Sequence, residues 1–257
     1  MNLTQSDLNA FAKKVDQAAQ TASAIQQFED GAFDVTEAYQ IQRLSIEKRL
    51  ERGELRSGIK MGFTSRAKMQ QMGVHDLIWG RLTDAMMIAE GTDEDMSRFI
   101  HPRVEPEIAF ILGDDLSGKV SIPEAMSCVE AIAPALEIID SRYEKFKFSL
   151  ADVVADNASS SGYVIGPWAA PEEPIDNLGI VMNINGRPRQ CGSTAAILGN
   201  PYRSLVHAAR LAEIAGEPLQ AGWVVMAGAA TAAEHLQQGD RVHAEFQNLG
   251  SVCFGVT

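Results

Sequence analysis

Two glutamates in "RVEPEIAFIL", Glu105 and Glu107, stand two positions apart and directly before the apolar run 108–112. Such a run is typical of a buried strand, and residues i and i+2 of a strand project from the same face. Adjacent half-buried carboxylates repel each other unless they are protonated or bind a cation, and oxygen ligands favour Mg²⁺, Mn²⁺ or Ca²⁺ over zinc. Pro106 cannot donate a ladder hydrogen bond, which favours an edge or mouth position. A solvated strand start is the alternative interpretation.

A third glutamate, Glu137, is the sole carboxylate inside the apolar stretch "APALEII". Buried unpaired glutamates are rare, so Glu137 requires a partner, and a cation shared with Glu105 and Glu107 would provide one. A position at a strand end is equally compatible with the sequence. Asp140 and Arg142, just beyond this stretch, are expected to pair with each other.

A lysine and a polar segment are further candidates for chemistry. Lys60 lies in the short apolar stretch "GIKMGF", where a lysine has no obvious solvated face. It could extend along the surface to water, or it could be a desolvated cation at an active site. The segment "DVVADNASSSG", residues 152–162, reads as a polar loop. Its hydroxyl and amide groups could bind a substrate carboxylate, although this composition is also typical of a surface turn.

The elements that must position these residues divide the chain into two parts. Residues 1–57 read as a helical region, in which Thr4 can cap a first helix and Thr36 lies before a second. Residues 58–257 are mainly short β-rich runs, with Asn185-Gly186 as a hairpin signal, interrupted by two helical patches. We therefore predict an α+β fold, with N-terminal helices packed on a mostly antiparallel sheet system that closes as a roll or barrel. The two parts can also count as one domain.

Composition narrows the class of partner. The formal net charge of -12 argues against nucleic acid and against an anionic membrane surface. An anionic substrate would need a bound cation or a few placed lysines and arginines. Cys128, Cys191 and Cys253 lack metal-ligand spacing and are expected to be small buried hydrophobes in a reducing compartment. Because neither a run of 18 apolar residues nor a charged-then-apolar leader occurs, we expect a soluble, cytoplasmic protein.

Four longer segments carry a resemblance to a known family. They are "GIKMGFTSRAKMQQMGV", "RVEPEIAF", "ALEIIDSRYEKFKFSLADVVADNASSSGYVIG" and "AGWVVMAGAATAAEHLQQGDRVHAEFQNLGSVCFGV". They resemble the hydratase/decarboxylase branch of the fumarylacetoacetate hydrolase superfamily, which implies N-terminal helices on a mixed β-roll or barrel. The resemblance also implies one divalent cation, Mg²⁺ or Mn²⁺, at Glu105, Glu107 and Glu137, with Lys60 as the catalytic lysine.

The same resemblance assigns substrate binding to two segments. The residues concerned are Asp156, Asn157, Ser159, Ser160, Ser161 and Thr231. Position 63 is Phe where many relatives carry Leu, so Phe63 is expected to reshape the pocket beside Lys60.

Within this branch, "KMGFTS" together with "SRYEKFKF" is most similar to members that decarboxylate 2-oxohex-3-enedioate (4-oxalocrotonate). Their products are CO₂ and 2-hydroxypenta-2,4-dienoate, the enol form of 2-oxopent-4-enoate, in the meta-cleavage degradation of aromatic compounds. One alternative is a hydratase of 2-hydroxypenta-2,4-dienoate or 2-oxohept-4-ene-1,7-dioate, which needs a general acid/base and an ordered water. Another is a catalytically silent scaffold subunit, against which the presence of all three carboxylates and the lysine argues.

The resemblance further implies a homo-oligomer and a complex with the pathway hydratase, for which β-rich segments with edges to cover give thin support. Residues 64–84, with Gly73 and Gly80 as hinges, are expected to close as a lid together with the N-terminal helices. The alternative for this segment is an ordinary packed helix and loop.

Overall fold

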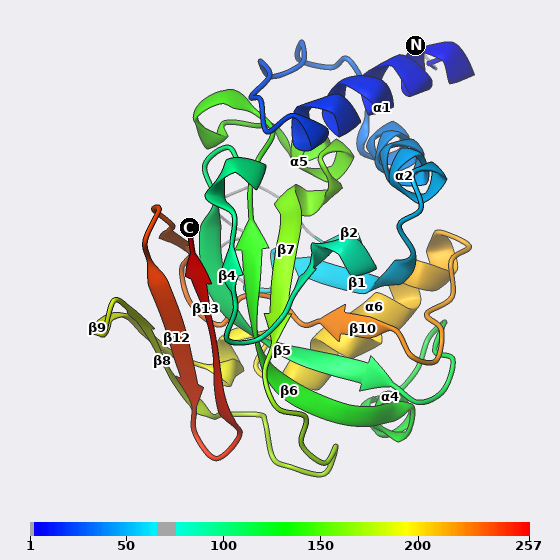
Figure 1. Ribbon diagram of the computed structural model, residues 1–257. Coiled ribbons are helices and arrows are strands. Elements are labelled where there is room, and N and C mark those ends of the chain that lie inside the picture. The colour runs from blue at the N-terminus through cyan, green and yellow to red at the C-terminus, as the bar shows by residue number, and fades with distance from the viewer. Residues whose placement is uncertain (1–2, 66–75) are drawn as a thin grey trace.

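Two N-terminal helices precede the sheets in the computed structural model, which describes residues 3–65 and 76–257. Helix α1 (Gln5–Gln20) begins with a capping box at Thr4, as predicted. Helix α2 (Val35–Glu51) is capped by Asp34 instead of following Thr36, because the Asp34 carboxylate accepts a hydrogen bond from the backbone N–H of Glu37. Figure 1 shows α1 and α2 beside the short helix α5 (Leu150–Ala155), with which they share an apolar cluster.

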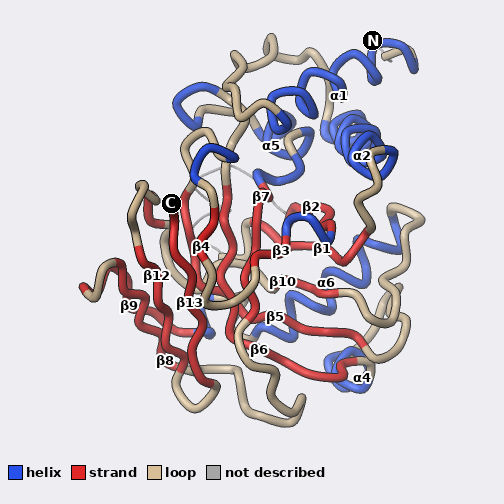
Figure 2. The backbone as a smooth tube through the Cα atoms, in the orientation of Figure 1, coloured by secondary structure: helices blue, strands red, loops and turns tan. Residues whose placement is uncertain are grey.

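The larger sheet has eight strands in the order β2-β1-β10-β5-β6-β7-β3, with β11 paired to β5 (Figure 2). Its longest strands are β5 and β6, which pair antiparallel, whereas β1 pairs parallel with β10. The strands are β1 (Arg56–Gly62), β2 (Ile78–Thr83), β3 (Met87–Ile88), β5 (Arg103–Leu112), β6 (Val129–Ile139), β7 (Ser160–Ile165), β10 (Val224–Met226) and β11 (Glu234–His235).

The smaller sheet has five strands in the order β4-β13-β12-β8-β9. The predicted Asn185-Gly186 hairpin joins β8 to β9, and both turn residues have the positive φ that such a turn requires. Its strands are β4 (Asp93–Glu94), β8 (Gly179–Ile184), β9 (Arg187–Ser193), β12 (Arg241–Phe246) and β13 (Gly250–Val256). Two further α-helices in the described part of the chain are α4 (Ile122–Ser127) and α6 (Pro201–Ile214).

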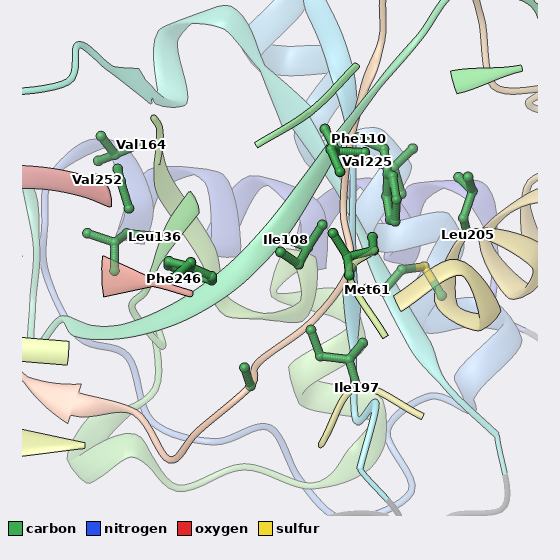
Figure 3. Close-up of a cluster of buried hydrophobic side chains, with 14 of the residues drawn as sticks. Met61, Ile108, Phe110, Leu136, Val164, Ile197, Leu205, Val225, Phe246 and Val252 are labelled. Carbon is green, nitrogen blue, oxygen red and sulfur yellow. The ribbon is translucent and has the colours of Figure 1, made fainter. Parts of the chain in front are cut away.

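An apolar core joins the two sheets and α6. Side chains from one face of β5 and β6 meet α6 and the inner face of the smaller sheet, and Figure 3 labels Ile108, Phe110, Leu136, Leu205, Phe246 and Val252 among them. The α+β architecture, with N-terminal helices on a largely antiparallel sheet system, is therefore confirmed. Within the described residues, no helix combines the length and apolarity needed to cross a bilayer.

The three cysteines are unpaired, as predicted, but the burial predicted for them is wrong. Cys191 is exposed because β9 is the outermost strand of the smaller sheet, and Cys128 and Cys253 are half-buried. Cys253 donates a hydrogen bond from its thiol to Glu90, 3.1 Å away, so it has a polar environment and not the apolar one expected.

Candidate metal centre and active site

Three carboxylates meet on one face of the β5–β6 pair. Glu105 and Glu137 are direct cross-strand partners, and Glu107 follows Glu105 by two positions on the same face. Each carboxylate offers an oxygen within 4.8 Å of the others, and all three residues are buried. The interpretation of a solvated strand start is therefore wrong. Glu137 does lie near a strand end, two residues before the last residue of β6, but it is buried there and converges with Glu105 and Glu107 as predicted.

Pro106 lies in an internal strand, so of the predicted edge or mouth position the edge is wrong. However, β10 pairs with residues 109–111 of β5, and β11 pairs with residues 103–104, so neither ladder includes residues 105–108. Pro106 lies in the gap between these two ladders, where its carbonyl accepts a hydrogen bond from the backbone N–H of Ala230. Its missing N–H thus interrupts no strand–strand ladder.

Lys60, on β1, points into this cluster and not toward water. Its ammonium lies 2.9 Å from Glu137 Oε2 and donates to the carbonyl of Ala158 at 3.2 Å. Burial acts to lower the pKa of Lys60, but the charges of the three glutamates together raise that pKa above its ordinary value. Lys60 is therefore a buried ammonium, and the surface-extended alternative is wrong.

Among residues 3–65 and 76–257, the three carboxylates of the cluster outnumber the one ammonium that contacts them. Burial raises the pKa of Glu107 well above its ordinary value, and the charges of Glu137 and Glu105 add to that rise. The charge of Lys60 and the backbone N–H of Gly228, which donates to Glu107 Oε2 at 2.7 Å, offset this rise only in part. Burial also raises the pKa of Glu137, against the opposing charge of Lys60.

A divalent cation fits this donor set. Oε1 of Glu107 and Oε1 of Glu137 are buried without a hydrogen-bond partner among the described residues. Among the described residues, three buried carboxylates face one ammonium, a formal charge of about two negative units that one divalent ion would balance. An all-oxygen set of this kind suits Mg²⁺ or Mn²⁺.

The segment predicted as a polar loop is a buried structural element. Its first part forms helix α5, and Asp156, which follows, forms an ion pair with Arg142. The predicted pairing of Arg142 with Asp140 is therefore wrong, because Asp140 instead accepts hydrogen bonds from the backbone N–H groups of Ile100 and His101, at 2.7 and 2.8 Å. Segment 152–162 lies inside the protein and is no surface turn.

The predicted substrate-binding residues differ in whether their polar side-chain groups already have hydrogen-bond partners in the described protein. The amide of Asn157 binds the backbone N–H and C=O of Arg81, at 2.7 and 2.8 Å. Ser161 accepts a hydrogen bond from Arg142 at 2.5 Å. In contrast, the hydroxyls of Ser159 and Ser160 are buried without a partner among the described residues.

The backbone of this segment is unusual as well. Asn157, Ala158 and Ser159 all have positive φ values, of 51°, 52° and 58°. Three such residues in succession are strained, and the resulting turn brings the Ala158 carbonyl to Lys60. The two serine hydroxyls remain the candidates to contact a ligand.

Segment 227–233 brings Gly228 to Glu107, a contact that the sequence prediction missed. Gly228 has a φ of 103°, and a Cβ there would lie 2.2 Å from Thr64 Oγ1, so only glycine fits. Thr231, predicted to bind substrate, is half-buried, and its hydroxyl donates to the Ala232 carbonyl at 3.0 Å. The glycine in "MAGAAT" is the one feature of the sequence that could have indicated the contact between Gly228 and Glu107.

The lid prediction is partly wrong and partly beyond the described residues. Residues 78–83 form strand β2, paired with β1, so they belong to the sheet. Gly80 is no hinge, because a Cβ there would lie 2.4 Å from the Asn157 carbonyl oxygen. Residues 66–75, including Gly73, lie outside the described residues. Phe63 is half-buried beside the cluster formed by the N-terminal helices, and its influence on the pocket stays a prediction.

Comparison with known proteins places these features in a family. The family model described as "Fumarylacetoacetate (FAA) hydrolase C-terminal" matches residues 67–257. A 4-oxalocrotonate decarboxylase from Pseudomonas sp is 56% identical over 97% of this chain and 98% of its own length. A 2-keto-4-pentenoate hydratase from Paraburkholderia xenovorans is 33% identical over 97% and 95% of the two chains.

A solved structure is similar over the whole chain. It is 4-oxalocrotonate decarboxylase from Pseudomonas putida G7, complexed with magnesium and adipate. It has a TM-score of 0.96 and 37% identity, and the match covers 100% of this chain and 99% of the other. These matches extend over the strands that carry Lys60 and the three glutamates. The chain belongs to the fumarylacetoacetate hydrolase family.

Proposed function

We propose that this protein is a metal-dependent carboxy-lyase that converts 2-oxohex-3-enedioate (4-oxalocrotonate) into 2-hydroxypenta-2,4-dienoate and CO₂. The observation that carries this proposal is the buried cluster of Glu105, Glu107 and Glu137 with Lys60. The decarboxylase at 56% identity and the hydratase at 33% favour decarboxylation over hydration. Such a reaction belongs to the meta-cleavage degradation of aromatic compounds.

The three glutamates would hold one Mg²⁺ ion, which supplies Lewis-acid polarisation of the 2-oxo acid when bound. The relative of known structure was solved with magnesium, which supports this choice of metal. The reaction breaks the C5–C6 bond of the substrate, and C6 leaves as CO₂. The electron pair left on C5 delocalises through the C3–C4 double bond to the C2 oxygen, which takes up a proton from water to give the enol product.

Lys60 provides a fixed positive charge for the oxygen that becomes negative in this step. Its ammonium is held by Glu137 and by the Ala158 carbonyl, so it requires little reorganisation during the reaction. Because the site is buried, the electrostatic contribution of this charge is larger than it would be in water. Ser159 and Ser160 would donate hydrogen bonds to a substrate carboxylate, since their hydroxyls have no described protein partner.

Hydration remains the second candidate, because a hydratase matches nearly the whole chain. An assay of the purified protein with Mg²⁺ distinguishes the two functions. The protein is incubated separately with 2-oxohex-3-enedioate and with 2-hydroxypenta-2,4-dienoate, and the products are identified. Decarboxylation predicts CO₂ and the pentadienoate from the first substrate, sensitivity to a chelator, and no water addition to the second. Water addition to the second substrate by this chain alone would indicate a hydratase.

For assembly, we propose a homo-oligomer that also associates with the pathway hydratase, whose substrate is the unstable dienol product. The support is the set of sheet edges that a partner could cover. Light scattering that gave a monomer near 27.9 kDa at micromolar concentration would contradict the homo-oligomer.

A further inference from the structure

Arg103 lies on the same face of β5 as the metal-binding glutamates. It precedes Glu105 by two positions, and the pairing of β5 with β6 is regular from Arg103 to Ile111. Its cross-strand partner, Ile139, lies two positions beyond Glu137 in the same way. Side chains at i, i+2 and i+4 of a strand share one face, so Arg103 extends the row formed by Glu105 and Glu107 toward the strand end.

The guanidinium of Arg103 lacks an acidic partner among residues 3–65 and 76–257. Its Nε is buried without a hydrogen-bond partner, and its described contact is with the Phe146 ring, 4.1 Å from Cζ to the ring centre. Every other described arginine that is not exposed forms an ion pair, namely Arg49, Arg56, Arg81, Arg142 and Arg210. A partly buried guanidinium that only stacks on a ring retains donors for an anion.

The ring that holds Arg103 is itself in a strained position. Phe146 has a φ of 57° and follows Lys145 at 59°, a conformation that is rare for a bulky side chain. The His101 ring contacts the same phenyl group, at 5.3 Å between ring centres, and its Nε2 is also buried without a partner among the described residues. Strain that the surroundings enforce is typical of ligand sites. In a chain of net charge -12, an arginine without a described acidic partner beside the three glutamates is a local exception.

Spacing and charge together suggest the ligand. Two residues along a strand span about 6.6 Å, and an arginine side chain extends the reach. A six-carbon dicarboxylate that was bound at the glutamates through its C1 end and extended along β5 toward the strand start would bring its other carboxylate to Arg103. We propose that Arg103 binds the C6 carboxylate and thereby selects dicarboxylate over monocarboxylate substrates. This inference rests on the proposed function.

The chemistry of the reaction determines which kinetic constant Arg103 affects. The C6 carboxylate is charged in the bound substrate and leaves as neutral CO₂, so its contact with a guanidinium weakens as the reaction proceeds. An interaction that is stronger with the substrate than with the transition state contributes to affinity and not to rate. Loss of Arg103 should therefore raise KM for the dicarboxylate, while kcat stays within a few-fold of the wild-type value.

Binding of two unreactive analogues tests the subsite directly. 2-Oxohexanedioate and 2-oxohexanoate share the C1 carboxylate, the 2-oxo group and the chain length, and differ in the C6 charge. Neither has the C3–C4 double bond that delocalises the electron pair. In calorimetry with Mg²⁺, Arg103→Met should weaken binding of the diacid roughly 10- to 100-fold and leave the monoacid unchanged. Arg187→Met, which removes an exposed arginine on β9 that has no described ionic partner, is the matched control and should behave as wild type.

Two results would overturn the proposal. One is an Arg103→Met variant that keeps the wild-type preference for the diacid. The other is equal weakening of both analogues, which would mean that Arg103 only supports Phe146. The monoacid also reports whether the variant is folded with an intact centre. If the wild-type chain failed to release CO₂ from 2-oxohex-3-enedioate, the proposed function would be wrong, whereas the diacid preference would still be measurable.

Discussion

The two faces of the β5–β6 pair have opposite chemical environments. Alternate residues on one face are apolar and lie in the core shared with α6 and the smaller sheet, whereas on the other face they include three buried glutamates. Burial stabilises the first face, by about 25 cal/mol for each Å² of apolar surface. The second face is costly, because its carboxylates are desolvated and repel one another. The comparison indicates that stiff strands anchored by the apolar face hold charges that would otherwise move apart.

The largest expected effect comes from removing one carboxylate of the polar face. Glu107→Gln should lower affinity for Mn²⁺ by more than the roughly 10- to 100-fold that loss of an outer-sphere partner costs, and should reduce activity to the metal-free level. Metal-free stability should stay the same or rise, because a repulsive buried charge is removed. Calorimetry and chemical denaturation measure the two quantities. Glu245→Gln, on an exposed position of β12, is the control, and full Mn²⁺ affinity in Glu107→Gln would place the metal elsewhere.

Removal of the buried ammonium should affect the rate. Lys60→Ala is expected to lower kcat by about 10²–10³-fold, the scale for loss of one preorganised donor to a developing oxyanion. Cation binding should persist or become tighter, since Glu137 loses its competing partner. Steady-state kinetics and Mn²⁺ calorimetry together distinguish this outcome from misfolding. A near-normal kcat would reduce Lys60 to a structural counter-charge.

A change on the apolar face should have the reverse pattern. Ile108→Ala leaves a cavity in the core and should lower the free energy of unfolding by about 2–5 kcal/mol. Because Ile108 faces away from the carboxylates, kcat and Mn²⁺ affinity of the folded fraction should remain close to wild type. Denaturant unfolding and assays below the melting transition give both values. Loss of metal affinity with only minor destabilisation would show that the two faces are not separable.

The smallest expected effect is a dependence on pH. The pKa of Glu107 is raised in the metal-free protein, so the folded state binds more protons than the unfolded state from the ordinary carboxyl range upward. This group's contribution to metal-free stability therefore falls as pH rises through that window. Mg²⁺ competes with the proton, so the rise in Tm on adding Mg²⁺ should grow with pH. A Mg²⁺-induced rise in Tm that did not depend on pH in wild type would contradict this linkage. The same would hold if the Mg²⁺-induced rise in Tm persisted in Glu107→Gln.

The parts of the fold and site that could be predicted are those with local signals. The period-two spacing of Glu105 and Glu107, the capping box at Thr4 and the Asn185-Gly186 turn each act within a few residues. The meeting of Glu137 with that pair required a further step, since it depends on the strand register between β5 and β6. The family resemblance, more than residue spacing, is what predicts that Glu137 joins Glu105 and Glu107. The division into two domains at residue 57 stays a prediction.

The features that could not be predicted depend on long-range geometry. Arg142 binds Asp156, 14 positions away, and not its near neighbour Asp140, because the Asp140 carboxylate already accepts hydrogen bonds from the backbone of a distant segment at Ile100 and His101. Gly228 reaches Glu107 from a segment 121 positions away, with no pattern that marks the contact. Helix α5 has only six residues, which is too short to give a periodic signal in the sequence, so the pattern of this segment predicts a loop.

The location of the bound metal tests the central claim most directly. Crystals grown with Mn²⁺ and measured at a wavelength where manganese scatters anomalously would reveal its position without reference to activity. The expected result is one strong anomalous peak in contact with oxygens of Glu105, Glu107 and Glu137, which is absent from crystals of Glu107→Gln. A peak bound by other residues, or an empty cluster beside an occupied site elsewhere, would contradict the assignment of this face of the sheet as the metal centre.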